Sequence, residues 1–209
     1  MTDMPSMIRV LVAEDDALER STVVDLLVAL GHMVVAEVES GAEAIEKARQ
    51  FAPDAVLLDV HMPGASGVQA SEEIANALPG TAVVLVTGDL SLTLSTADVL
   101  RSTAVALLAK PTPPTTLDAT LRLAVMRARE LLAARKEAAD AKHQLEARKL
   151  IERAKGLLMR RTGSTEQEAY RIMQRSSQDR SVPMVEIARA VIDSEPGRKE
   201  ERLKTKEEG

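Results

Sequence analysis

The sequence predicts an α/β domain with a doubly wound parallel sheet, followed by a long helix and a small all-α domain. In the first half, short apolar runs alternate with amphipathic stretches of helical spacing. The runs AVLLDV and AVVLVT are β-rich and apolar on both faces, as buried parallel strands require. Past Pro113 the alternation stops, and Ala, Leu, Glu, Lys and Arg dominate. The strand candidates are residues 8–13, 33–38, 55–60, 82–87 and 105–109.

Helices are expected between these strands, where apolar residues recur every three or four positions. Gly31 is placed to end the first helix, and Ser40 and Ser91 are placed to cap later ones. Doubly wound sheets hold their binding sites at the carboxyl ends of the strands, which is where functional residues are to be sought. The helix candidates are residues 17–30, 42–51, 68–78 and 91–101.

The composition restricts the class of protein. The 209 residues suffice for two modest domains, and the absence of cysteine excludes disulfides and thiolate metal sites. The three histidines, His32, His61 and His143, are too scattered to form a metal cluster. The start lacks the pattern of a signal peptide, and no apolar run approaches the roughly 20 residues that a membrane span needs. We therefore expect a soluble, cytoplasmic protein with no membrane partner.

The charge is unevenly distributed along the chain. Up to Asp118 there are six Lys and Arg against 17 Asp and Glu, whereas from Ala119 onward there are 21 against 15. Halves of opposite charge indicate different partners, although solvated helix faces would give the same bias. Only Phe51 and Tyr170 are aromatic. The cores must therefore be aliphatic, and a platform for stacking bases is not expected.

Residues suited to phosphoryl chemistry fall at the carboxyl ends of the predicted strands. They are Glu14, Asp15 and Asp16 after the first, Asp59 near the end of the third, Thr87 at the end of the fourth and Lys110 after the fifth. A carboxylate that accepts a phosphoryl group needs a divalent cation to screen repulsion, and oxygen ligands hold Mg²⁺ best. It also needs a fixed cation, which a lysine supplies, and a hydroxyl that responds to the new group.

These residues and their surroundings resemble the receiver domains of two-component systems. The motifs that carry the resemblance are VLVAEDDA, LLDVHMPGASG, VVLVTG and LLAKP, and it covers residues 7–125. It implies a five-stranded, flavodoxin-like parallel sheet and a cis peptide bond between Lys110 and Pro111. It also implies transfer of a phosphoryl group from a sensor histidine kinase to Asp59 with Mg²⁺, followed by slow autodephosphorylation. We expect no other enzymatic activity, because nothing after Ala119 forms a phosphate loop or a paired-carboxylate motif.

The same resemblance implies a role for each residue of the site. Asp59 is the phosphoryl acceptor, and Thr87 and Lys110 respond to the phosphate. The expected metal ligands are Glu14, Asp15, Asp59 and the backbone carbonyl of His61. Of the acidic run, Asp15 is the first choice for direct metal contact and Asp16 is the least essential.

Two positions depart from the receiver pattern. Leu107 stands three residues before Lys110, where an aromatic residue usually couples phosphorylation to the output surface. Gly88 follows Thr87 where alanine is more common. A leucine has no polar ring to move between buried and exposed states. How the receiver signals through this surface is therefore open.

A long helix is predicted over residues 116–159, because the stretch contains no proline and no glycine before Gly156. Within residues 126–148 an apolar seam steps by three and four positions, as in a coiled coil. The alternative is a helix packed only on its own domain, since the seam is short and rich in alanine. The seam consists of Leu131, Ala134, Ala138, Ala141 and Leu145.

The last part of the chain predicts two further helices and a charged tail. Residues 162–165, TGST, end the long helix, and Ser164 or Thr165 caps a second helix that runs to about Arg175. A third helix begins near Pro183 and runs to about Asp193. Residues 195–209 lack a core-forming pattern and are expected to be disordered.

Residues 149–194 resemble the ANTAR domain, a three-helix module of transcription antiterminators. The matching positions are Ala154, Gly156, Ala169, Tyr170, Arg175 and Ala188, and Ser176 replaces the usual alanine. Small residues at Ala154 and Ala169 allow helices to approach closely, and Ala188 is expected in the same core. We expect Tyr170 to fill the core between them, and the alternative is that its ring stacks on RNA.

The resemblance implies that this domain binds RNA carrying two hairpins with similar loops. A basic surface attracts phosphates, so its Lys and Arg residues are the candidate contacts, and the alternative for any one of them is a solvated charge. Two hairpins would bind two copies of the domain, and a homodimer formed through the seam of the long helix would supply them. The arrangement is similar to the phosphorylation-dependent antiterminators of mycobacteria and other actinobacteria, and the alternative is an output domain that binds DNA or a protein. A DNA ligand is disfavoured because no helix-turn-helix pattern is present. The candidate RNA contacts are Arg153, Lys155, Arg160, Arg161, Arg171 and Arg175.

Overall fold

The computed structural model describes residues 7–64, 66–88 and 104–195. The helix expected over residues 91–101, its cap Ser91 and nearly all of the tail expected to be disordered lie outside these ranges. The described chain divides into two compact units between Arg135 and Lys136, and we describe each unit by itself.

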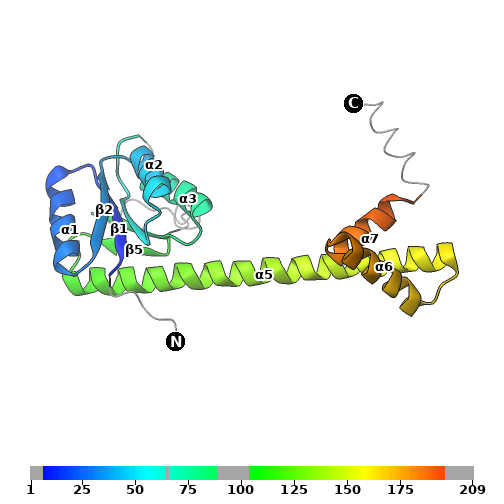
Figure 1. Cartoon of the computed structure of the whole chain (residues 1–209). Coiled ribbons are helices and arrows are strands. Elements are labelled where there is room, and N and C mark those ends of the chain that lie inside the picture. The colour runs from blue at the N-terminus through cyan, green and yellow to red at the C-terminus, as the bar shows by residue number, and fades with distance from the viewer. Residues whose placement is uncertain (1–6, 65, 89–103, 196–209) are drawn as a thin grey trace, which may run out of the picture. The chain divides into compact units, whose positions relative to one another are not determined.

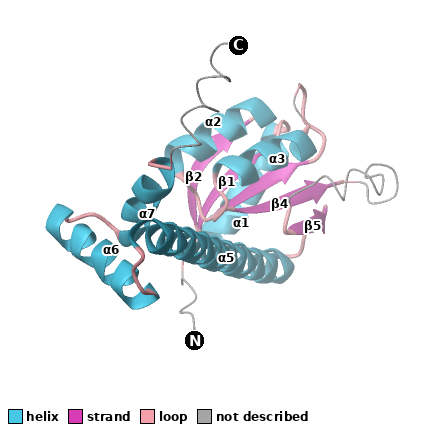
Figure 2. Ribbon diagram, turned by 90° about the vertical axis from the view of Figure 1, so that its right-hand side faces the viewer, coloured by secondary structure: helices cyan, strands magenta, loops and turns pink. Residues whose placement is uncertain are grey.

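The first unit is built on a sheet of five parallel strands, which confirms the predicted fold (Figures 1 and 2). The strands lie in the order β2-β1-β3-β4-β5, with β2 and β5 at the two edges. Central strands buried on both faces read as continuous apolar runs, as β3 does with five buried residues. The strands are β1 (Arg9–Ala13), β2 (Met33–Val38), β3 (Ala55–Asp59), β4 (Ala82–Thr87) and β5 (Ala106–Ala109).

Helices cover both faces of the sheet (Figure 1). On one face, α1 (Ala17–Ala29) and the first turns of α5 (Pro114–Thr162) pack on Val10 and Val12 of β1. On the other, α2 (Gly41–Phe51) and α3 (Gly67–Ala77) pack on Leu11 and Ala13 of the same strand. Successive side chains of a strand point to opposite faces, so one apolar run supplies both cores.

The helix ends of the first unit follow from local side-chain chemistry. Asp16 caps α1 by accepting hydrogen bonds from the backbone N–H groups of Leu18 and Glu19, both at 2.9 Å. Ser40 caps α2 as predicted. Gly31, predicted to end α1, has a φ of +83°, in the left-handed region that glycine adopts without a steric penalty. The Lys110–Pro111 peptide bond is cis, as the receiver resemblance implies.

The second unit consists of the end of α5, α6 (Glu166–Arg180) and α7 (Met184–Asp193). Its core is small and aliphatic. Thr165 caps α6 in a capping box with Glu168. The prediction that this helix ends near Arg175 was wrong by five residues, because the chain stays helical until Ser181 turns left-handed, with a φ of +52°. The buried core residues are Ala154, Leu157, Met173, Ile187, Ala188 and Ile192.

No helix within the described ranges combines the length and the apolar character that crossing a membrane would require.

Candidate functional site

The acidic residues predicted to act together meet at the carboxyl edge of the sheet. Glu14 and Asp15 follow β1, and Asp59 ends β3, which pairs directly with β1. One carboxylate oxygen from each of the three lies within 4.8 Å of the others. Glu14 and Asp59 are buried, whereas Asp15 is exposed. Three hard oxygen donors at this spacing fit a divalent cation such as Mg²⁺, so the donor set matches the predicted metal site.

Lys110 is the cation of the site. It follows β5, and its Nζ donates hydrogen bonds to Glu14 at 2.5 Å and to Glu19 at 2.7 Å and lies 2.9 Å from Oδ1 of Asp59. Burial disfavours the charged ammonium, but the three carboxylates outweigh this and raise the pKa of Lys110 above its usual range. Burial also raises the pKa of Glu14, although the contact with Lys110 acts in the opposite direction. Lys110 therefore stays charged and is held among three acids.

Backbone contacts connect the acceptor to the residues expected to sense phosphate. The N–H of His61 donates to Oδ2 of Asp59 at 2.9 Å, which fixes one face of the carboxylate, while the imidazole of His61 is exposed. Thr87 is buried at the end of β4, and its carbonyl accepts the N–H of Lys110 at 2.8 Å. Asp59 ends β3, and Thr87 ends the neighbouring strand β4. Thr87 in turn contacts Lys110 through its carbonyl.

Two residues of the site escaped the sequence analysis. Arg20 donates from Nη1 to the backbone carbonyl of Glu14 at 2.7 Å and forms an ion pair with Glu39 at 2.9 Å. It therefore fixes the backbone of the acidic residues that follow β1. Glu19 reaches Lys110 from the first turn of α1. The available signal for Glu19 was its place near a helix N-terminus, where the dipole favours an acid. That signal does not reveal a partner 91 residues away.

Gly67 packs against the backbone where β3 ends at Asp59 and the following loop begins. A Cβ atom at this position would lie 2.1 Å from the carbonyl oxygen of Asp59 and 3.1 Å from Cα of Val60, both rigid backbone atoms. We expect Gly67→Ala to displace this loop and destabilise the receiver by roughly 1–3 kcal/mol, a typical cost of overpacking. Chemical denaturation followed by circular dichroism measures the loss.

Gly88→Ala is the matched control for this prediction. A Cβ atom at Gly88 meets no described atom within 4 Å, so the stability of this variant is expected to stay close to that of the parent. Equal losses in the two variants would contradict the close-contact explanation. The control also tests whether the departure at Gly88 from the usual alanine matters for folding.

The second departure, Leu107, lies on β5 at the edge of the sheet and is 40% exposed. An aliphatic side chain of this kind has no hydroxyl to bury or release.

The predicted residues of the second unit divide into two groups. Ala154, Ala169 and Ala188 are fully buried, with no exposed surface. The prediction that Tyr170 fills the core was wrong, since its side chain is exposed. Met173, one turn after Ala169 on α6, occupies that space instead, because residues four apart share a helix face and residues one apart do not.

Lys155 is a second correction. It was predicted to contact RNA, but it is buried, with its Nζ 2.8 Å from Glu152 and 2.7 Å from Glu166. The hydrogen bonds to Glu152, which has the larger effect, and to Glu166 raise the pKa of Lys155. Its charge is therefore used to attach the start of α6 to α5. The other candidates for RNA contact are all exposed, namely Arg153, Arg160, Arg161, Arg171 and Arg175.

Comparison with known proteins agrees with the two units. Residues 10–122 match the response regulator receiver domain, and residues 139–192 match the ANTAR domain. The receiver part is similar in structure to the signal receiver domain of NarL from Mycobacterium tuberculosis, with a TM-score of 0.51 and 30% sequence identity. The match covers 60% of this chain and 98% of that chain. The chain belongs to the response regulators of two-component systems, with a receiver domain and an ANTAR domain.

One relative matches nearly the full length. The chain is 38% identical over 190 residues to the transcriptional regulatory protein PdtaR of Mycobacterium tuberculosis, covering 89% of this chain and 90% of that protein. The response regulator GacA of Pseudomonas viridiflava is 43% identical over 82 residues, but this covers only 39% of this chain and 38% of GacA. The likeness to PdtaR therefore includes both domains, whereas the likeness to GacA is local.

Proposed function

We propose that the chain is a cytoplasmic transcription antiterminator that a sensor histidine kinase controls by phosphorylating Asp59. The observation that carries this proposal is the combination, in one chain, of a complete acidic receiver site with an ANTAR domain. The absence of cysteine suits a reducing compartment. We assign the receiver to residues 7–125, a helical linker to 126–148 and the RNA-binding domain to 149–194, and we assign no enzymatic role beyond phosphorylation and dephosphorylation of the receiver.

Phosphoryl transfer at this site requires little covalent chemistry from the protein. One carboxylate oxygen of Asp59 bonds to phosphorus as the bond between phosphorus and the kinase histidine breaks, and the imidazole leaves with a solvent proton. The residues that would hold Mg²⁺ are Asp15, Glu14, Asp59 and the carbonyl of His61, with Asp15 the most accessible. Bound Mg²⁺ screens the repulsion between the acidic site and the donor. Lys110 neutralises a phosphoryl oxygen, and the hydroxyl of Thr87 turns toward the new group.

RNA binding is assigned to the exposed arginines of the second unit. Arg153 and Arg175 are the first choices, because each lies on the surface of a helix of the ANTAR domain. The exposed ring of Tyr170 lies one residue before Arg171 on α6, and it offers a face on which a single base can stack. The proposed ligand is an RNA leader with two hairpins. The alternative ligands are DNA, which is the control of the test below, and a protein.

The test measures binding to a labelled twin-hairpin RNA with and without beryllofluoride and Mg²⁺, with a DNA duplex of matched sequence as the control. Selective binding to RNA that strengthens with beryllofluoride supports the proposal. Binding to RNA in both states keeps the RNA-binding assignment but removes phosphorylation control, which would point to Leu107. Equal binding to RNA and DNA would overturn the antiterminator assignment and leave the receiver assignment in place.

Two hairpins require two output domains, and the exposed seam of α5 fits a second copy of the chain. All five seam residues are exposed, including Leu131 and Leu145. The charges beside the seam select the orientation. In a parallel, in-register pair, heptad spacing places Glu130 opposite Arg135 of the second copy, and Glu137 likewise opposite Lys142. An antiparallel pair would set like charges against each other, so we propose a parallel dimer that phosphorylation favours.

Because the chain has no cysteine, a single introduced thiol reports this arrangement. Ala134→Cys lies off the centre of the seam, so two copies meet thiol to thiol only in the parallel register. We expect a disulfide-linked dimer under mild oxidation, more of it with beryllofluoride, and less after Glu137→Lys. An unchanged monomer mass in both states would contradict the dimer. Linkage only between Ala134→Cys and Leu145→Cys chains, which pair a d position with an a position, would instead show an antiparallel pair.

A further inference from the structure

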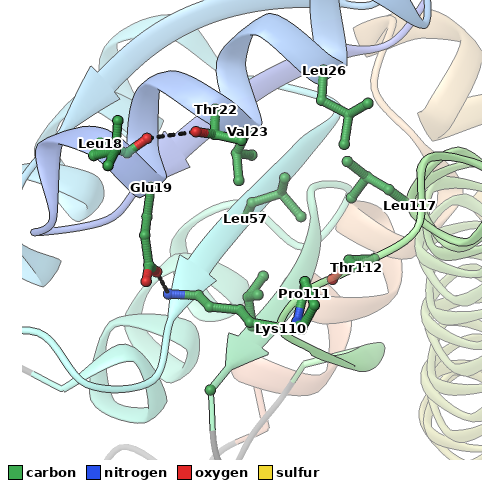
Figure 3. A pocket seen from close by; sticks show the side chains of 12 residues that line it. Leu18, Glu19, Thr22, Val23, Leu26, Leu57, Lys110, Pro111, Thr112 and Leu117 are labelled. Atoms are coloured by element: carbon green, nitrogen blue, oxygen red, sulfur yellow. Dashed lines mark hydrogen bonds and ion pairs between the residues drawn. The ribbon is translucent and has the colours of Figure 1, made fainter.

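Glu19 is a third acid on Lys110, and the receiver chemistry described above has no use for it. Two of the three carboxylates around the ammonium, Glu14 and Asp59, belong to the acidic site itself. The third comes from α1, and Figure 3 shows Glu19 and Lys110 directed toward each other across the space between α1 and the loop after β5. The Nζ–Oε2 distance of 2.7 Å is that of a charge-assisted hydrogen bond.

The backbone of Glu19 is fixed, whereas its carboxylate is free to leave. The cap on α1 holds the N–H of Glu19 against Asp16, so the first turn is anchored. The side chain itself is about half exposed, with 53% of its surface accessible, against 6% for Glu14 and 6% for Asp59. It borders an open cavity of about 540 Å³ whose walls are mainly apolar, among them Leu26 and Leu57. A side chain that is half exposed already has solvent beside it into which it can rotate.

The contacts of Lys110 leave no donor for an incoming phosphoryl group. An ammonium has three N–H donors, and here it has three carboxylate partners. A phosphoryl oxygen must replace one of them. Glu14 is buried and would be costly to leave unpaired, and Asp59 is the acceptor itself. Glu19 is the partner that water can solvate most readily once it is released.

We propose that Glu19 is a positioning residue that occupies one N–H donor of Lys110 in the unphosphorylated receiver and is displaced when the phosphoryl group arrives. This inference rests on the proposed phosphorylation of Asp59. The contact between Glu19 and Lys110 opposes phosphorylation, because it must be broken when the phosphoryl group arrives and breaking it costs free energy. The contact is also local to α1, so it changes the response of the receiver without changing the acceptor or the metal ligands.

The test compares Glu19→Gln with Glu46→Gln, which removes the same charge from an exposed position on α2 where the partner is Lys47. The readouts are the beryllofluoride concentration that half-saturates the receiver in the presence of Mg²⁺, followed by NMR, and the dependence of the labelling rate on acetyl phosphate concentration. We expect Glu19→Gln to tighten beryllofluoride binding by about two- to five-fold, the range of an exposed ion pair. Glu46→Gln is expected to leave it unchanged.

A double-mutant cycle with Lys110→Ala separates this role from a general charge effect. If Glu19 acts through Lys110, the gain from Glu19→Gln disappears when Lys110 is absent. An equal gain in both backgrounds would overturn the proposal, as would weaker binding in Glu19→Gln, which would mean that Glu19 orients Lys110 for the phosphoryl group. Failure of the unmodified protein to bind beryllofluoride or accept phosphate would instead refute the proposed phosphorylation itself.

Discussion

Replacement of Asp59 by asparagine is expected to abolish phosphorylation of the chain completely. The amide lacks the anionic oxygen that attacks phosphorus, and it removes one of the three oxygen donors that lie within 4.8 Å of one another. It also leaves Lys110 without one of its three acidic partners. Intact-mass spectrometry after incubation with acetyl phosphate and Mg²⁺ measures the result as the fraction of chain that gains one phosphoryl group.

Asp16→Asn is the control for this prediction. Asp16 is the third acid of the run after β1, but its carboxylate caps α1 instead of facing the acidic site. Asparagine is an equally good cap, so the fold is kept while one negative charge is removed. We expect this variant to be labelled like the parent. Labelling that persists in Asp59→Asn and is lost in a variant of a neighbouring acid would show that the acceptor is a different residue.

The receiver site could be predicted from sequence because its residues sit at strand ends. Parallel strands bring their carboxyl ends to one edge, so Asp15, Asp59 and Lys110 meet there whatever the lengths of the intervening helices. The strand order does not follow from the alternation of strands and helices, and the structure gives it as β2-β1-β3-β4-β5. Glu19 could not be predicted, because its contact depends on the direction of a side chain in a helix turn.

The errors in the output domain have a similar cause. Counting charges along α5 marks Lys155 as part of a basic surface, but its partner Glu166 follows a turn and returns to it from α6. Motif spacing placed Tyr170 beside Ala169 without saying which of two adjacent residues faces the core. Helical periodicity decides this only when the buried direction is known, and Met173 shows that direction.

Removal of two arginines from α6 is expected to weaken RNA binding strongly. Arg171 and Arg175 are four residues apart, so they lie on one face of the helix, and both are exposed. Each charge-assisted contact with a phosphate contributes about 1.5 kcal/mol, which corresponds to roughly ten-fold in affinity. The variant Arg171→Ala with Arg175→Ala should also reduce the slope of log affinity against log salt concentration by about two. Fluorescence anisotropy at several salt concentrations measures both effects.

The matched control removes two other exposed arginines, Arg127→Ala and Arg189→Ala, which form ion pairs with Glu130 and Glu186. Each is engaged by a neighbouring glutamate and neither is a candidate RNA contact, so their loss should change neither the affinity nor the salt slope appreciably. An equal loss in the two double variants would mean that net charge alone attracts RNA.

Lys155→Ala gives a third, distinct result, because it should lower the melting temperature of the domain by leaving Glu152 and Glu166 without their shared cation. A basic residue that binds RNA and one that holds two helices together are thereby distinguished by salt dependence and by thermal stability.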